Sequence, residues 1–351
     1  MKITKLWLIA LLLSLWLLPG PTMAEPNGVI RGRVRNGTPG SGSVKGLEVV
    51  LHSFQGQTEG ETHSTTLDAE GSFAFEGLET ATTWSYLPKV TYEGVTYSQG
   101  ILAFEADQTE ITVEITVYET TRERDGIRAD RAHLLIGVDG TTLTVTELYV
   151  IINPGDRTYV GTEELEGRRW TSRFYLPTGA HTLTFDDGTL GGRFLAMAGG
   201  FVDAEPLWPG RTNIMFSYRI DCATGRCDLS REITYDITNL NVLIPSGRAT
   251  IVSDQLLLEG TVGSQQEEYQ NLVARNIPAG ERLDIRVRLA GTAFSGSTSP
   301  SASRLPWYLL GGVLAALAVL YPFWRQRVRA AAWAEFQAAQ EGPQRQHKKD
   351  T

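Results

Sequence analysis

The chain has 351 residues, of which 42% are hydrophobic and 21% charged, so it holds enough apolar material to bury more than one core. Its net charge of −8 is unevenly distributed, because residues 25–304 hold 24 Lys and Arg against 37 Asp and Glu, a net of −13. Affinity for a nucleic-acid backbone comes from cationic side chains on phosphates. The composition therefore argues against nucleic acid as a partner and favours an acidic, soluble surface.

The N-terminus has the pattern of a signal peptide. Lys2 and Lys5 precede an uncharged apolar run over residues 6–18, and a helix-breaking Pro-Gly-Pro segment follows. A span of the hydrocarbon core needs about 20 residues, whereas the apolar part of a signal peptide needs only about 7–15. We expect residues 1–24 to be a signal peptide cleaved after Ala24, with an uncleaved anchor as the alternative.

Residues 25–120 show the alternation typical of one-sided β-strands. Ile30 and Val34 alternate with arginines, and Phe73 and Phe75 alternate with polar residues. Gly-containing turn signals separate these runs. Period-2 alternation with frequent short turns is typical of antiparallel sheets with one solvent-exposed face. The pattern predicts a β-sandwich in this region.

The same region resembles the carboxypeptidase regulatory-like domain, a transthyretin-like or Cna-B-like β-sandwich of bacterial envelope proteins. The resemblance is carried by residues 28–38, 47–51 and 65–78, with a continuation over 92–97. In that family the domain is a non-catalytic appendage with a carbohydrate-binding-like fold. The resemblance thus implies a bacterial envelope protein and no catalysis in this sandwich.

Four aromatic residues in the first sandwich have two interpretations. Trp84, Tyr86 and Tyr92 share one parity of a predicted strand, and Tyr97 follows the next turn. On a solvent-exposed face they would stack against sugar rings, as in some sandwiches of the superfamily that this region resembles. On the inner face they would be core, which is where aromatic residues of strands usually lie, and we favour this interpretation.

A charged stretch near residues 120–130 interrupts the alternation and marks a boundary. Alternation then resumes and extends to residues 283–289, where apolar positions alternate with Arg and Asp. We expect residues 131–290 to be a second β-rich domain, either one large sandwich or two small ones. The fold class predicted for residues 25–290 is all-β, with two or three antiparallel sandwiches in tandem.

Cys222 and Cys227 are the only cysteines in the chain. They lie between two strand-like runs, and outside the cell they would be oxidised. A redox pair normally has two intervening residues, not four, and a metal site would need further ligands. We therefore predict a structural disulfide that closes a hairpin.

The sequence holds no motif of a catalytic or metal site. It has no Gly-x-Ser-x-Gly segment, and no histidine pair has the spacing of a zinc site. The pattern of residues 68–71 favours a hairpin turn over a calcium-binding loop. We expect no catalytic residue, no metal and no cofactor, and keep an uncharacterised hydrolase in residues 131–290 as the less favoured alternative.

The C-terminal part has the pattern of a tether and a membrane anchor. Residues 291–304 are rich in Gly, Ser and Thr, and residues 305–324 contain no charge over a length that spans a bilayer. Arg325, Arg327 and Arg329 follow at once. By the positive-inside rule they place the tail, residues 325–351, in the cytoplasm.

These patterns together predict a single-pass protein of the bacterial cytoplasmic membrane whose N-terminal region lies outside. We expect a non-enzymatic binding or spacer module for an unknown protein or envelope component. Carbohydrate binding through the first sandwich is the alternative.

Overall fold

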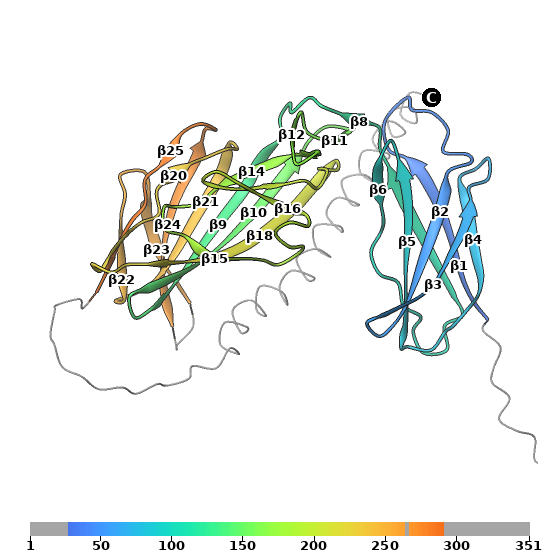
Figure 1. Cartoon of the computed structure of the whole chain (residues 1–351), viewed down its shortest axis with the longest axis horizontal. Helices are drawn as coiled ribbons and strands as arrows, with labels where there is room; N and C mark the ends of the chain where they lie inside the picture. Colours follow the sequence, from blue (N-terminus) through green and yellow to red (C-terminus); the bar gives the residue numbers. More distant parts are fainter. Residues whose placement is uncertain (1–26, 264–266, 291–351) are drawn as a thin grey trace, which may run out of the picture. The chain divides into compact units, whose positions relative to one another are not determined.

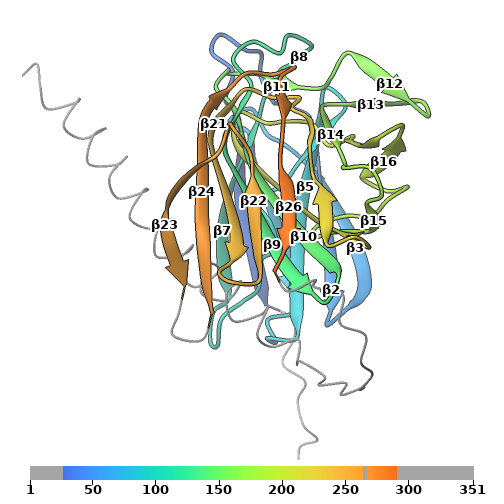
Figure 2. The ribbon, with the colours of Figure 1, turned by 90° about the vertical axis from the view of Figure 1, so that its left-hand side faces the viewer.

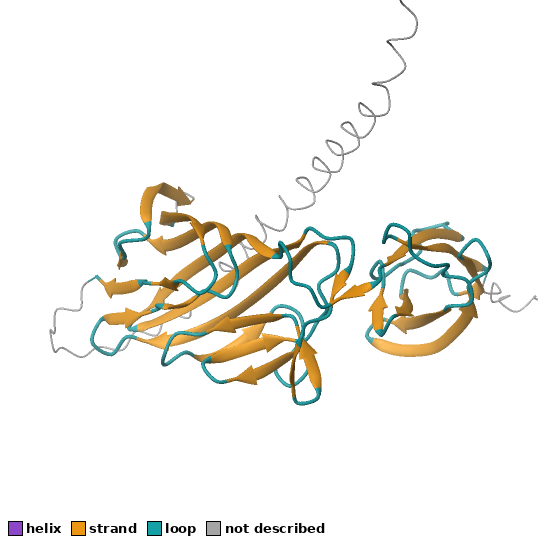
Figure 3. Cartoon of the chain, turned by 90° about the horizontal axis from the view of Figure 1, so that it is seen from above, coloured by secondary structure: helices purple, strands orange, loops and turns teal. Residues whose placement is uncertain are grey.

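The computed structural model describes residues 27–263 and 267–290, in which all regular structure is β-strand (Figure 3). The all-β prediction is therefore confirmed for these residues. Within them no helix has the length and apolar character of a membrane span. The predicted signal peptide, tether, transmembrane helix and cytoplasmic tail lie outside the described residues.

The first seven strands form two sheets that face each other across one core (Figure 1). One sheet has the order β4-β1-β7 and the other the order β3-β2-β5-β6. Strands β1 and β7 are parallel, and the other pairs are antiparallel. The strands are β1 (Gly28–Asn36), β2 (Glu48–Gln55), β3 (Thr58–Thr66), β4 (Ser72–Leu78), β5 (Trp84–Tyr92), β6 (Val95–Tyr97) and β7 (Glu110–Val117).

The alternation read from the sequence decides which face of β1 is buried. Ile30 and Val34 are buried, whereas Arg31, Arg33 and Arg35 point to solvent. Carboxylates of the neighbouring strands β4 and β7 neutralise two of these arginines, because Arg31 pairs with Glu76 and Glu110, and Arg35 pairs with Glu114. The outer face of this sheet is thus a charge-balanced surface.

The second core lies beneath a seven-stranded sheet of order β15-β18-β10-β9-β21-β24-β23. The pair β9–β21 is parallel and the other pairs are antiparallel. Strand β23 is one edge of the sheet (Figure 2). The strands are β9 (Arg128–Asp139), β10 (Thr142–Asn153), β15 (His181–Phe185), β18 (Gly210–Asp221), β21 (Ile237–Pro245), β23 (Leu257–Gly263) and β24 (Glu268–Ile277).

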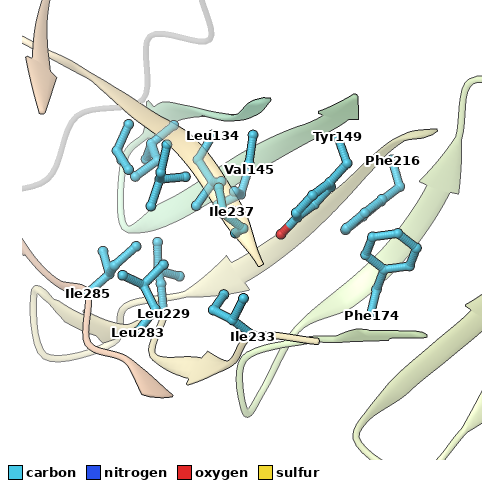
Figure 4. Packing of buried hydrophobic residues seen from close by; sticks show 14 of the residues in the cluster. Leu134, Val145, Tyr149, Phe174, Phe216, Leu229, Ile233, Ile237, Leu283 and Ile285 are labelled. Atoms are coloured by element: carbon cyan, nitrogen blue, oxygen red, sulfur yellow. The ribbon is translucent and has the colours of Figure 1, made fainter. Parts of the chain in front are cut away.

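Three small sheets complete this core: β14-β17-β16, β19-β26-β22 and β20-β25. Apolar side chains of these sheets and of the segments between their strands face those of the large sheet. Leu229 and Ile285, which lie in such segments, are opposite Leu134 and Val145 (Figure 4). The strands are β14 (Ser172–Tyr175), β16 (Phe194–Met197), β17 (Gly200–Asp203), β19 (Arg226–Asp228), β20 (Arg231–Glu232), β22 (Ala249–Val252), β25 (Arg282–Leu283) and β26 (Arg286–Leu289).

Two further short pairings occur in the described chain. Strand β8 (Thr120–Thr121) pairs in parallel with β11 (Thr158–Tyr159), and β12 (Glu163–Leu165) forms a hairpin with β13 (Arg168–Trp170). The stretch near residues 120–130 thus contains a short strand and does not consist of loop alone. One buried cluster comprises residues between 30 and 117, and the other comprises residues between 127 and 289.

Candidate functional site: an arginine face beside a charged cleft

The predicted disulfide is present and joins the end of β18 to β19. Cys222 and Cys227 have their Cα atoms 5.1 Å apart, and no other cysteine occurs in the chain. The Cys222 amide donates to Thr141 O, and the Gly225 amide donates to Cys222 O. The bond does not close a hairpin, as the sequence predicted, because β18 belongs to the seven-stranded sheet and β19 pairs with β26. It closes a turn between two sheets, and backbone hydrogen bonds also hold this turn.

Strand β19 presents Arg226 to solvent directly opposite Arg288 on β26. Arg286 lies on the same exposed parity of β26, opposite Asp228. Like charges directly opposite one another across antiparallel strands are destabilising. Among the described residues, no ion pair with a carboxylate forms at Arg226, Arg286 or Arg288, and we call these three residues the arginine face.

The arginine face contrasts with the other arginine stripe of the molecule. On β1, acidic neighbours on both adjacent strands hold Arg31 and Arg35 in ion pairs. On β26, by comparison, Arg288 is flanked by Arg226 on one side and Thr250 on the other. On the central strand of this sheet, Arg288 therefore has a like-charged and a neutral neighbour, whereas Arg286 lies opposite the acidic Asp228.

A cleft of about 430 Å³ opens next to the arginine face and includes Arg226 and Asp228 in its lining. The corner at residues 175–179, the disulfide-bonded turn and strands β20 and β25 form its walls. Glu232 and Arg282 also line it. The rim thus carries side chains of both signs, and the side that continues into the arginine face holds both Arg226 and Asp228 of β19.

A buried ion pair connects the cleft to the second core. Arg231 on β20 lines the cleft, and its Nη2 donates to Glu147 Oε2 on β10 over 2.7 Å. The Tyr149 hydroxyl donates to the same oxygen, and the Tyr218 hydroxyl donates to Glu147 Oε1, each over 2.9 Å. The carboxylate is thus held by three donors in a region that excludes water, which favours a structural role.

The ionisation of this cluster follows from its burial. Burial is the largest single effect on the pKa of Arg231 and would lower it, but the interactions with Glu147, Tyr218 and Tyr149 together outweigh burial, and the pKa of the guanidinium is raised. Burial and then the Glu147 charge raise the pKa of Tyr149 and Tyr218. Arg231 therefore stays charged and both hydroxyls stay protonated donors at neutral pH.

Asp221, His181 and Thr182 form a row of carboxylate, imidazole and hydroxyl at the end of β18. His181 Nε2 lies 3.4 Å from Asp221 Oδ2, and its Nδ1 lies 2.9 Å from Thr182 Oγ1. Thr182 is the neighbour of His181 in the chain, has a φ of 54°, and lies where the register of β15 shifts. The histidine and the aspartate are about half exposed, so solvent screens their attraction. The row results from the local backbone conformation.

The four aromatic residues of the sugar-stacking alternative are divided between core and surface. Tyr86 and Tyr97 are fully buried, and their hydroxyls donate to backbone oxygens of Glu79 and Tyr118. Trp84 and Tyr92 are half-buried at opposite ends of β5. The structure therefore does not bring the four rings together on an exposed face.

One signal in the sequence could have located the buried ion pair. Strand β10 alternates strictly, and Leu143, Val145, Tyr149 and Ile151 point into the core. Glu147 occupies the same parity, so a carboxylate at an inward position indicates a buried cationic partner. Its partner, Arg231, lies 84 residues away in a two-residue strand, which no periodicity could identify.

No family model matches the chain, and no curated protein matches it. Among solved structures, an M1 zinc metallopeptidase from Deinococcus radiodurans has 13% identity over 51% of this chain and 51% of its own, with a TM-score of 0.30. A DUF3823 family protein from Parabacteroides merdae has 13% identity over 55% of this chain and 81% of its own, with a TM-score of 0.20. The chain thus spans about half the length of the metallopeptidase. Neither likeness is strong enough to assign a function.

Proposed function

We propose that the chain is a non-enzymatic, membrane-anchored module that binds an acidic partner outside the cytoplasmic membrane of a bacterium. The observation that carries the proposal is the arginine face, where Arg226 and Arg288 lie directly opposite each other with no carboxylate in an ion pair. The partner is a protein segment rich in Asp and Glu. The predicted signal peptide and C-terminal anchor supply the location.

The local excess of positive charge supports this proposal because the surrounding region is acidic. Residues 25–304 carry a net charge of −13, so a random surface position is more often near a carboxylate than near a second arginine. A guanidinium offers a planar fork of donors that matches a carboxylate or phosphate in two-point contact. An acidic segment on the arginine face would relieve the repulsion between Arg226 and Arg288.

The adjacent cleft extends this surface and gives it selectivity. Glu232 is exposed on the rim and makes no ion pair among the described residues. A purely polyanionic chain would meet repulsion there, whereas a protein segment with a basic residue beside its acidic run would contact both ends of the surface. The mixed rim therefore favours a polypeptide over a uniform anionic polymer.

The test is binding of a fluorescent acidic peptide to the purified full-length chain, measured by anisotropy at two salt concentrations. We expect saturable binding that weakens as salt rises, because exposed charges are screened. The variant Arg226→Gln/Arg288→Gln should weaken binding by about tenfold, which equals about 1.4 kcal/mol. The matched control is Arg31→Gln/Arg35→Gln, which removes two exposed but ion-paired arginines and should leave binding unchanged.

Two results would contradict the proposal. The first is equal binding of the acidic peptide by the wild-type chain and by the Arg226/Arg288 variant. The second is that an anionic envelope polymer binds as tightly as the peptide and that Glu232→Gln changes neither affinity. That result would show that the surface binds polyanions in general. In native membranes, a photoreactive residue at Thr178, which lines the cleft, should give an adduct that is lost in the Arg226/Arg288 variant.

Carbohydrate binding is tested separately, through the first sandwich. Trp84 is half-buried at one end of β5, whereas Tyr86 belongs to the core. Retention on a polysaccharide column that Trp84→Ala abolishes, with an unchanged unfolding midpoint, would favour sugar binding over the acidic partner. Tyr86→Ala is not a suitable probe, because it removes a core ring and should cost about 3–5 kcal/mol of stability.

A further inference from the structure

Exposed apolar side chains are concentrated on one strand of the second core. Six large hydrophobic residues are exposed in the described chain, and three of them belong to the seven-residue strand β23. Leu257 is 71% exposed, Leu258 is 62% exposed and Val262 is 45% exposed. A fourth, Val252, ends β22, five residues before Leu257. Single, scattered apolar residues are normal on the surface of a soluble protein, whereas several on one strand indicate an interaction surface.

Strand β23 is also a sheet edge, and a register shift between Leu258 and Gly260 interrupts its pairing with β24. It pairs with β24 on one side, and among the described residues no strand pairs with its other side (Figure 2). Natural edge strands are usually protected by lysine, proline, inward-pointing charge or a β-bulge, and of these β23 has the bulge. The sequence Leu-Leu-Glu-Gly-Thr-Val-Gly contains neither lysine nor proline. Its one charged residue, Glu259, is held by Arg275 of β24 at 2.8 Å.

The pairing of β23 with β24 shows which side chains share a face. Leu257 lies opposite Val273 and Val262 lies opposite Tyr269, and these two partners have the same parity on β24. Leu258 lies opposite Leu272, which has the other parity. The register shift between Leu258 and Gly260 therefore places Leu257 and Val262 together on one face of the sheet and Leu258 on the opposite face.

We propose that β23 is the dimerisation edge of this protein and pairs antiparallel with β23 of a second copy. With the two-fold axis between Glu259 and Gly260, Leu257 of each copy lies directly opposite Val262 of the other. Apolar cross-strand pairs of this kind stabilise a sheet, and the edge amides and carbonyls gain partners at the same time. The interface is isologous, as a two-fold dimer requires.

The low charge of β23 favours pairing with a second copy of the same strand over pairing with an acidic or basic strand of another protein. In this register Glu259 faces Gly260 of the partner copy, so the two glutamates do not oppose each other. The strand is otherwise uncharged, and Arg275 already neutralises Glu259. A strongly charged foreign strand would find no complementary charge along the edge, whereas an identical neutral strand presents apolar residues at the matching positions.

The test uses the full-length chain in mild detergent, followed by sedimentation velocity over a concentration series. We expect a reversible monomer–dimer equilibrium, and Leu257→Lys/Val262→Lys should raise the dimer dissociation constant by about tenfold or more, because it places four ammonium groups in the interface. The matched control is Ile101→Lys, which removes an equally exposed apolar residue at a distant position and should leave the dissociation constant unchanged.

Disulfide trapping tests the register. In Leu257→Cys/Val262→Cys the two new cysteines are too far apart along one strand to bond with each other, so oxidation should produce covalent dimers. Leu258→Cys/Val262→Cys, whose new cysteines lie on opposite faces, should give at most a tenth of that yield. A chain that stays monomeric over the whole series, a dimer insensitive to the two lysines, or equal trapping in both cysteine variants would overturn the proposal.

Discussion

Glu147 on β10 and Arg231 on β20 form a 2.7 Å ion pair in which both side chains are almost completely buried, although 84 residues separate them. The pair fastens a two-residue strand of a small sheet to the centre of the large sheet. It joins two layers of the second core through the one carboxylate on the inward face of β10.

We expect Arg231→Met to lower the free energy of unfolding by about 3–5 kcal/mol, because it leaves a buried carboxylate without its cation. The double variant Glu147→Leu/Arg231→Met should lose less than the sum of the two single variants. Denaturant titration of all three gives the coupling energy directly. The control is Arg35→Met, which breaks an equally short but exposed ion pair and should cost less than about 1 kcal/mol. Equal losses in both cases would contradict the structural role of the buried pair.

For the arginine face we predict a change of the opposite sign in the free energy of unfolding. Because Arg226 and Arg288 repel each other across β19 and β26, Arg226→Thr should raise the free energy of unfolding by about 0.2–1 kcal/mol in the absence of a partner. High salt should reduce the gain, since screening weakens the repulsion in the wild type. A destabilisation measured in low salt would show that Arg226 has a compensating interaction in the free protein.

Removal of the disulfide should have a modest effect. The bond closes a loop of six residues, so the chain-entropy relation gives a loss of about 2 kcal/mol for Cys222→Ala/Cys227→Ala. A reducing agent should lower the stability of the wild type by a similar amount and leave the double variant unchanged. If reduction has no effect on the wild type, the turn is held by its hydrogen bonds alone.

His133 makes stability depend on pH. Burial on the sheet, followed by the charge of Arg131, lowers its pKa in the folded state. The unfolded chain therefore binds a proton at a higher pH than the folded chain, near the ordinary pKa of about 6.5. Stability is fully present above that pH and falls as the pH drops from there toward the lowered pKa. His133→Gln should show a smaller loss of unfolding free energy between pH 7.5 and pH 5, measured by urea titration, and an equal loss would contradict this assignment.

Much of the architecture follows from local rules. Alternation assigned the buried parity of β1 and of β4, because a strand turns successive side chains to opposite faces. The Cys222–Cys227 disulfide was predictable from the spacing, since two cysteines five positions apart in a short turn lie close together, although the turn joins two sheets and does not close a hairpin. Trp84, Tyr86 and Tyr97 were more ambiguous, because parity says which residues share a face but not which face is covered.

The sequence alone determined where strands form and which of their residues are apolar on one side, because these properties depend on neighbours within a few positions. Only the tertiary structure decided that Glu147 meets Arg231, that Arg226 faces Arg288, and that β23 is left at an edge. Each of these relationships joins strands distant in sequence, and strand order is set by how all the apolar faces are buried together, which no single segment encodes.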